Sequence, residues 1–233
     1  MKDTDVIILC GGLGKRLRPV VSDRPKSLAR INKTAFLDIL IGYLLSFGFK
    51  RFILCCGYMG DLIREHYNKA SCASKIVFSQ ETKLLGTGGA LKNSRRLIRS
   101  NPFLVLNGDS FLKLNLRNFY KFHLQKNAIL SIALSSPKQD QNSGVVTLDN
   151  KKRIIEFNEK IKPARKTYCS AGIYFMDQKI FKFMGKRKVF SLEYDLFPTL
   201  TNKYSYGYYC KNSFIDIGTP QNLMKAEEFL KHV

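Results

Sequence analysis

The sequence predicts an α/β fold: a Rossmann-like, mixed but mostly parallel sheet flanked by helices. Five short apolar runs look like buried strands, at 5–10, 51–56, 75–80, 103–109 and 128–134. Stretches with a helical period fill the gaps between them, which is typical of parallel strands covered on both faces. A loop rich in glycine and cations, "GGLGKRLRP" at 11–19, directly follows the first run. Open α/β sheets bind ligands at this end of their strands.

The helices and the remaining strands follow from the same patterns. Helices are expected at 35–48, where Gly48 suits a C-terminus, and at 60–69, 87–100 and 116–127. Beyond residue 140, close runs at 144–149, 153–159 and 168–176 predict antiparallel or mixed strands beside the sheet. A last helix is expected after Thr219, which caps it, with Pro220 as its first residue.

The composition excludes several classes of protein. No apolar run is long enough to span a membrane, and the N-terminus "MKDTDVIILC" predicts a strand rather than a signal peptide. The six cysteines form no C-x-x-C pair, which favours reduced thiols in a cytoplasmic protein over a disulfide framework or a zinc site. The three histidines fall in polar helical stretches, and we assign them no chemistry.

The chain is strongly basic. Lys and Arg outnumber Asp and Glu by 39 to 18, a formal net charge of +21. Such a balance suggests an anionic partner, either nucleic acid, a membrane surface or phosphorylated small molecules. The charges are spread along the chain without a basic tail, however, as a lysine-rich solvated surface would have them. Net charge therefore does not select a partner.

The glycine-rich loop has the composition of a phosphate cradle. Its three glycines let backbone N–H groups approach an anion, and its three cations add charge. It matches neither common phosphate motif, because Arg16 stands where a P-loop needs Ser or Thr and Leu17 stands where a dinucleotide fingerprint needs its third glycine. By itself, the loop fits a tight turn with solvated lysines equally well.

The longer segment resolves this ambiguity. "GGLGKRLRP" followed by "PK" at 25–26 resembles the signature of the sugar-1-phosphate nucleotidyltransferases. The resemblance continues in order through "ETKLLGTGGAL" (81–91), "NGD" (107–109), "EFNEK" (156–160), "SAGIY" (170–174), "FSLE" (190–193) and "FIDIGTP" (214–220). It implies the nucleotidyltransferase fold without a C-terminal β-helix. We expect one domain over 1–233, with a nucleotide-binding half at about 1–140 and a sugar-phosphate-binding half at about 141–233.

The resemblance also implies functional residues. The catalytic residues are expected to be Arg16, Lys26, Asp109 and Asp216. The nucleotide is expected to contact Leu9, Gly11, Gly12, Gly14, Lys15, Arg16, Gln80, Glu81, Gly86, Thr87 and Gly108. The sugar phosphate is expected to contact Asn107, Glu159, Lys160, Ala171, Gly172 and Glu193.

The family reaction joins an NTP to a sugar 1-phosphate and releases pyrophosphate. A phosphate dianion is already nucleophilic at neutral pH, so the protein has to position two anions and offset charge. Asp109 ends an apolar strand and Asp216 lies between two isoleucines. Because buried unpaired carboxylates are costly, a shared Mg²⁺ would satisfy both, although each also suits a turn or helix cap. Arg16 is assigned to the triphosphate and Lys26 to the α-phosphate or the incoming sugar phosphate.

The base and the sugar follow from finer features. Glu81 begins an E-x-x-x-L-G-T pattern that resembles the family's guanylyltransferases, which favours GTP, while the adjacent Gln80 keeps UTP open. Among short members, the chain resembles the guanylyltransferases that act on D-glycero-α-D-manno-heptose 1-phosphate for bacterial surface polysaccharides. The alternatives are a mannose-1-phosphate guanylyltransferase and an N-acetylmuramate-1-phosphate uridylyltransferase.

The expected partners are therefore small molecules, an NTP and a sugar 1-phosphate, with Mg²⁺ as cofactor. We expect neither nucleic acid binding nor stable membrane association, because a basic binding module would not need aspartates embedded in apolar strands. A regulatory protein with an inactive transferase fold is a further alternative, but it should have lost an aspartate or Arg16, which this chain keeps. Oligomeric state stays open, a homo-oligomer included.

Overall fold

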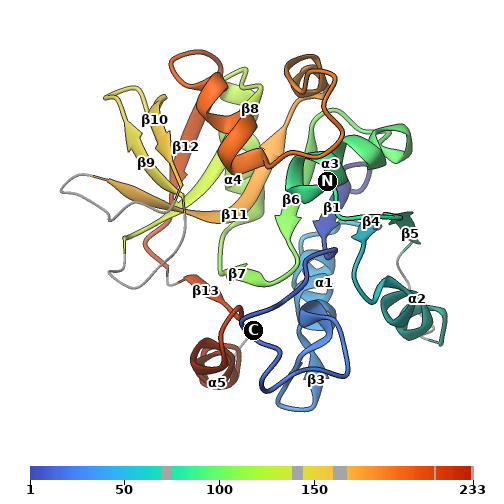
Figure 1. Cartoon of the computed structure of the whole chain (residues 1–233). Helices are drawn as coiled ribbons and strands as arrows, with labels where there is room; N and C mark the ends of the chain where they lie inside the picture. The colour runs from blue at the N-terminus through green and yellow to red at the C-terminus, as the bar shows by residue number, and fades with distance from the viewer. Residues whose placement is uncertain (70–74, 138–143, 160–166, 213, 232–233) are drawn as a thin grey trace.

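A nine-stranded sheet forms the centre of the structure, a computed structural model that describes residues 1–69, 75–137, 144–159, 167–212 and 214–231. Its strands run in the order β10-β9-β11-β6-β1-β4-β5, and β8 pairs with β11 and β12 off this path. The strand bounds are β1 (Asp5–Leu9), β4 (Arg51–Cys56), β5 (Lys75–Gln80), β6 (Phe103–Asn107), β8 (Leu130–Ser135), β9 (Val145–Leu148), β10 (Ile154–Asn158), β11 (Tyr168–Met176) and β12 (Ser205–Tyr209). Figure 1 shows β4 and β5 at one side of the molecule and β9, β10 and β12 at the other.

The predicted fold class is confirmed. β6, β1, β4 and β5 are parallel neighbours, and β11 joins β6 antiparallel. The late runs form antiparallel strands, as expected, because β9 pairs antiparallel with both β10 and β11. The two halves of the chain therefore share one sheet.

The helices and short turns lie around this sheet. Their bounds are α1 (Phe36–Ser46), α2 (Gly60–Lys69), α3 (Gly86–Ser94), α4 (Leu116–Gln125) and α5 (Pro220–Phe229), with the short helical segments η1 (Lys26–Leu28), η2 (Arg95–Leu97), η3 (Gln178–Phe183), η4 (Leu192–Leu196) and η5 (Phe197–Leu200). The helix expected over 87–100 ends at Ser94 and continues as η2. Thr219 caps α5 as predicted, accepting from the Asn222 backbone N–H over 3.2 Å.

Alternation along β1 divides the core between the two faces of the sheet. Val6 and Ile8 belong to one cluster, which α1, α2 and α4 cover. Ile7 belongs to a second cluster, which α3 and the turns η3 to η5 cover. Successive side chains of a strand point to opposite faces, so an uninterrupted apolar run is what a sheet covered on both sides requires.

Two small ladders escaped the sequence analysis. β2 (Arg30–Ile31) pairs with β3 (Thr34–Ala35), and β7 (Ser110–Leu112) pairs antiparallel with β13 (Phe214–Asp216). Elements of two or three residues are too short to carry a periodic pattern. The second ladder matters for the site, because its register places Asp216 opposite Ser110, directly after Asp109.

Candidate active site

The site forms where neighbouring parallel strands end together. Leu9, the last residue of β1, is paired with Asn107, the last residue of β6. The glycine-rich loop leaves from one strand and the Gly108–Asp109 segment from the other. Glu81 follows β5, and its backbone N–H bonds the Cys56 carbonyl at the end of β4. Three of the predicted motifs thus meet at one edge of the sheet for a topological reason.

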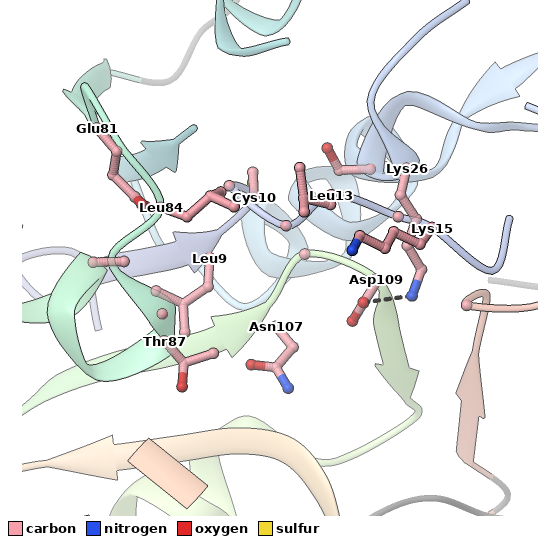
Figure 2. A pocket seen from close by; sticks show the side chains of 18 of the residues that line it. Leu9, Cys10, Leu13, Lys15, Lys26, Glu81, Leu84, Thr87, Asn107 and Asp109 are labelled. Atoms are coloured by element: carbon pink, nitrogen blue, oxygen red, sulfur yellow. Dashed lines mark hydrogen bonds and ion pairs between the residues drawn. The ribbon is translucent and has the colours of Figure 1, made fainter. Parts of the chain in front are cut away.

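A cavity of about 480 Å³ opens at this edge. It is lined by thirteen of the predicted site residues: Leu9, Gly11, Gly12, Gly14, Lys15, Arg16, Lys26, Glu81, Gly86, Thr87, Asn107, Gly108 and Asp109. Figure 2 shows Glu81 and Leu84 toward one end and Lys15, Lys26 and Asp109 toward the other. The cavity therefore has a partly apolar end with one carboxylate and a second end dominated by cations.

Two glycines of the loop are needed for different structural reasons. Gly14 adopts φ +60°, a conformation that a side chain would strain. A Cβ at Gly11 would lie 2.8 Å from Oε1 of Glu81, so the loop backbone packs directly against that carboxylate. No helix begins after the loop, since residues 15–20 form turns. The cradle is therefore made of loop backbone rather than of a helix N-terminus.

Lys26 connects the two predicted metal aspartates. Its Nζ donates to Oδ2 of Asp109 over 2.6 Å and to Oδ1 of Asp216 over 3.2 Å. The lysine side chain is 13% exposed, and each carboxylate is 33% exposed. The two aspartates also serve local bonds, because Ser110 Oγ donates to Asp109 and the Gly218 N–H donates to Asp216. The sequence led us to expect that a shared Mg²⁺ satisfies both carboxylates, and it did not reveal that Lys26 pairs with them.

The proximity of these charges shifts their pKa values. Burial alone would lower the pKa of the Lys26 ammonium, but the two carboxylates outweigh burial and raise it. Burial would raise the pKa of Asp109, yet the ammonium 2.6 Å away holds it below its usual range. Burial and the charge of Asp109 raise the pKa of Asp216, which lies farther from the ammonium. Asp109 is therefore the better-stabilised carboxylate of the pair.

The carboxylate pair fits a divalent cation. Asp109 Oδ2 and Asp216 Oδ1 converge on one position, where the ammonium lies. Among the described residues, no group of three His, Cys, Asp or Glu could hold a metal. A cation bound here would take its remaining ligands from phosphate oxygens and water, as Mg²⁺ commonly does.

Gly218 completes this end of the cavity, and the sequence analysis missed it. A Cβ at this position would lie 2.6 Å from both Asp216 Oδ1 and Lys26 Nζ, and 3.2 Å from the Arg16 guanidinium. Because Gly218 has no side chain, Lys26, Arg16 and the Asp216 carboxylate can pack closely around its backbone. The matched "FIDIGTP" segment contains it, and that segment was the available signal.

Glu81 is anchored in the wall of the cavity. The side chain is buried, and its Oε2 accepts the Leu85 backbone N–H over 3.0 Å. Burial raises the pKa of Glu81, and the bond from Leu85 partly opposes this. Its other oxygen lies against Gly11. Gln80 is not brought to the cavity, because its exposed side chain lies over Gly60 on the opposite side of the strand end.

The "LGTGG" segment is held by a segment from the other half of the chain. The Phe190 carbonyl accepts the backbone N–H groups of Gly88 and Gly89, over 3.0 and 3.2 Å. A Cβ at Gly86 would lie 2.5 Å from the same carbonyl oxygen. These glycines thus allow close packing, and the N–H groups of Gly88 and Gly89 near the start of α3 are used within the protein rather than offered to an anion.

The predicted sugar-phosphate residues lie partly outside the cavity. Asn107 lines it, and its Nδ2 lies 2.8 Å from where Gly172, at φ +69°, would carry a Cβ. Ala171 is buried in the core, and Glu159 lies beside Gly144 after β10. Lys160 lies outside the described residues. The sugar-binding role of these residues stays a prediction.

The remaining lining residues were not singled out by sequence. They are Cys10, Leu13, Ser27, Leu84 and Ala90, which supply mostly apolar surface. Cys10, Cys55 and Cys56 are free and buried, Cys210 is free and half-buried, Cys169 is buried, and Cys72 lies outside the described residues. None of the described helices combines the length and apolar character needed to cross a membrane.

Comparison with known proteins adds to this geometry. Residues 5–233 match the nucleotidyl transferase family. The D-glycero-alpha-D-manno-heptose 1-phosphate guanylyltransferase of Aneurinibacillus thermoaerophilus is 35% identical over 230 residues, which cover 98% of this chain and 99% of that protein. A protein of the same description from Campylobacter jejuni is 33% identical over 216 residues, covering 93% and 95%.

A solved structure agrees with these relatives. The crystal structure of HddC from Yersinia pseudotuberculosis superposes with a TM-score of 0.85 at 34% identity, covering 98% of this chain and 100% of that one. The same protein complexed with GMP-PN superposes with a TM-score of 0.83.

Proposed function

Because this chain belongs to the nucleotidyl transferase family, we propose that it transfers the guanylyl group of GTP to D-glycero-α-D-manno-heptose 1-phosphate. The products are pyrophosphate and GDP-heptose. The relatives that match nearly end to end carry this description, and a similar structure is complexed with GMP-PN.

The observation that carries the proposal is the polarity of the cavity. One end has apolar side chains and the buried carboxylate of Glu81, which suit a base with hydrogen-bond donors. The other end has Lys15, Arg16 and Lys26 beside backbone N–H groups of the glycine-rich loop, which suit a triphosphate. A nucleotide laid along the cavity meets complementary chemistry at both ends.

The chemistry needs no general base. An oxygen of the sugar phosphate attacks the α-phosphorus, a new P–O bond forms, and the bond to the departing pyrophosphate breaks with its electron pair on the leaving oxygen. Lys26 and Arg16 bind and orient the phosphates and offset their charge, which is the main catalytic requirement of such a transfer. A Mg²⁺ held by Asp109 and Asp216 supplies further charge neutralisation when bound.

Glu81 supports guanine as the base. Guanine presents N1–H and N2–H₂ donors, and a carboxylate accepts from both. Oε2 of Glu81 already accepts the Leu85 N–H, which holds the side chain in place and leaves Oε1 at the cavity wall near Gly11. Gln80, the residue that kept UTP open, lies away from the cavity.

Asn107 supports a sugar or ribose contact at the middle of the cavity. Its Oδ1 is buried and has no hydrogen-bond partner among the described residues. A buried acceptor of this kind is costly, and because it has no solvent access a ligand hydroxyl bonds it only if the Asn107 amide turns toward the cavity that the residue lines. Glu159, Lys160 and Glu193 remain the candidates for the rest of the sugar phosphate.

We further propose that the enzyme works in the cytoplasm and that its product serves surface polysaccharide synthesis. An enzyme for mannose 1-phosphate, or a uridylyltransferase for N-acetylmuramate 1-phosphate, is the second candidate. Small phosphorylated substrates account for the cationic end of the cavity, so no nucleic acid partner is needed.

A pyrophosphate-release screen tests the proposal. Four NTPs are crossed with heptose, mannose, glucose and N-acetylmuramate 1-phosphates, each with and without Mg²⁺. We expect the highest kcat/KM for GTP with the heptose phosphate and no release without metal. Higher efficiency with mannose 1-phosphate or with UTP selects the second candidate. Salt-dependent DNA binding without any pyrophosphate release contradicts transferase function.

A further inference from the structure

Lys26 lies where the ligands of a shared cation would meet. Its ammonium is within hydrogen-bond distance of Asp109 Oδ2 and Asp216 Oδ1, so both oxygens are directed at the same position. The lysine is largely buried and also lines the cavity. Gly218 closes the ammonium from one side, since a Cβ there would lie 2.6 Å from Nζ. The open direction for the side chain is therefore the cavity.

An ammonium and a divalent cation cannot share these oxygens. Mg²⁺ binds carboxylate oxygens at about 2.1 Å, closer than an N–H···O hydrogen bond allows, and the two cations would repel each other in the same space. Two cations, Lys26 and Arg16, and two anions, Asp109 and Asp216, balance each other around Gly218. A divalent cation entering alone would add uncompensated positive charge to this group, whereas one entering with a polyphosphate brings the negative charge that Lys26 and Arg16 can bind.

We propose that Lys26 and the divalent cation are alternative occupants of the Asp109–Asp216 site. In the free enzyme the lysine neutralises both carboxylates and keeps metal affinity low. When nucleotide phosphates enter the cavity, Lys26 exchanges the carboxylates for phosphate oxygens, and the vacated oxygens bind the metal. Metal and nucleotide therefore bind together with positive coupling. This inference rests on the proposed function, because it takes the polyphosphate of a nucleotide as the partner that draws Lys26 away.

Metal binding to the nucleotide-free protein tests the exchange without any turnover. Mn²⁺ alone is titrated into wild type, Lys26→Met and Lys26→Gln, and bound metal is followed by electron paramagnetic resonance. Removing the lysine should tighten Mn²⁺ binding by about tenfold or more, a size common for coupling between two ligands. The two neutral variants protect the test against one that folds poorly, and circular dichroism confirms the fold of each.

Arg16→Met is the matched control. It removes one positive charge from the same neighbourhood without removing an ammonium from the two carboxylates, so it should tighten Mn²⁺ binding much less. The double variant Lys26→Met with Asp109→Asn should lose the gain, because one of the two vacated oxygens is no longer charged.

Three results overturn the exchange. Equal Mn²⁺ affinity in wild type and in both Lys26 variants is the first. The second is a gain in Mn²⁺ affinity in Arg16→Met as large as that in Lys26→Met, because the effect would then come from the loss of any nearby positive charge. The third is a gain in Mn²⁺ affinity that persists when Lys26→Met is combined with Asp109→Asn, because the metal would then bind at another site. Pyrophosphate release by wild type is measured separately, so failure of the exchange is distinguishable from failure of the proposed reaction.

Discussion

The hydroxyl of Thr87 donates a hydrogen bond to Oε2 of Glu193 over 2.6 Å, joining residues 106 positions apart in the chain. The same hydroxyl accepts the Leu192 backbone N–H over 2.9 Å, and Ser191 Oγ donates to Oε2 of Glu193 over 2.7 Å. Thr87 follows Gly86 at the wall of the nucleotide cavity, whereas Glu193 belongs to the half assigned to the sugar phosphate. The threonine hydroxyl therefore joins the two halves of the chain, while the residue lines the cavity and its contact with a nucleotide stays a prediction.

Replacing Thr87 by Val should weaken the fold. The change keeps the shape but leaves the Leu192 N–H without its acceptor and removes one of the two hydroxyls that donate to Oε2 of Glu193, the other being that of Ser191. We expect the free energy of unfolding to fall by about 1–3 kcal/mol, the cost of such unsatisfied groups. Urea denaturation measures it. Thr87→Ser keeps the hydroxyl and should lose much less, so equal losses in the two variants contradict the hydrogen-bonding role.

Replacing Gly218 by Ala should damage the site more than the fold. The new Cβ would meet Asp216 Oδ1 and Lys26 Nζ at 2.6 Å and force both groups apart. We expect a large loss of kcat/KM with a smaller change in Tm. Gly42→Ala is the matched control, because a Cβ there meets nothing within 4 Å. Alanine in helix α1 should slightly stabilise the protein. Full activity in Gly218→Ala would show that the close packing of Lys26 and Asp216 around this residue is not needed.

Asp109→Asn and Asp216→Asn should each abolish most turnover. Each change removes a charge expected to hold Mg²⁺, and a single electrostatic contributor of this kind is commonly worth ~3 kcal/mol or more in the transition state. Steady-state pyrophosphate release measures the loss, and circular dichroism checks the fold. Asp61→Asn, an exposed carboxylate on α2, is the control. Full activity in either site variant removes that residue from the catalytic group.

Glu81→Gln should weaken GTP selectively. The glutamine can still accept the Leu85 N–H through its oxygen, but it then presents an amide donor toward the donors of guanine. Such a buried mismatch costs roughly 1–3 kcal/mol, on the order of a ten- to hundredfold loss in kcat/KM. UTP, if it is used, should change little. An unchanged ratio of GTP to UTP efficiency contradicts a base-reading role and assigns Glu81 to the loop alone.

His123 should make stability depend on pH. The ring is buried between α4 and β8, bonds Ser131 Oγ over 2.9 Å and lies against Phe175. Burial lowers its pKa to about 4, although the charge of Asp177 opposes this. The unfolded chain protonates His123 near its ordinary pKa, so it binds more protons than the folded chain below that value. The free energy of unfolding should therefore fall as pH drops from 7 to 4, by up to about 3 kcal/mol from this residue.

Urea midpoints of wild type and His123→Gln over this pH range check the effect. The variant stays neutral, so its curve should be flatter on the acidic side whatever its stability at pH 7. Parallel curves would remove His123 as the source of the pH dependence. From the sequence, His123 lies in a polar helical stretch, and its burial could not be predicted. In a helix of mixed composition, the sequence does not show which turn packs against the sheet.

Gln80 and Glu81 illustrate how much of the site could be predicted from the sequence. Both residues were expected to contact the nucleotide, with Glu81 favouring GTP and Gln80 keeping UTP open. The structure turns Gln80 outward over Gly60 and buries Glu81 at the cavity. Neighbouring residues at a strand end point to opposite sides, but which side holds the cavity depends on the packing of the whole sheet.

The sequence by itself determined the fold class, the succession of strands and helices, and the chemical types that gather at the strand ends. These features depend on residues that are close along the chain, where periodicity and turn chemistry are legible. Only the tertiary structure decided which groups meet: Lys26 bridges carboxylates 83 and 190 positions away, and Gly218 packs beneath them. Such meetings depend on strand order and on the β7–β13 ladder, and a ladder of three residues leaves no pattern in the sequence.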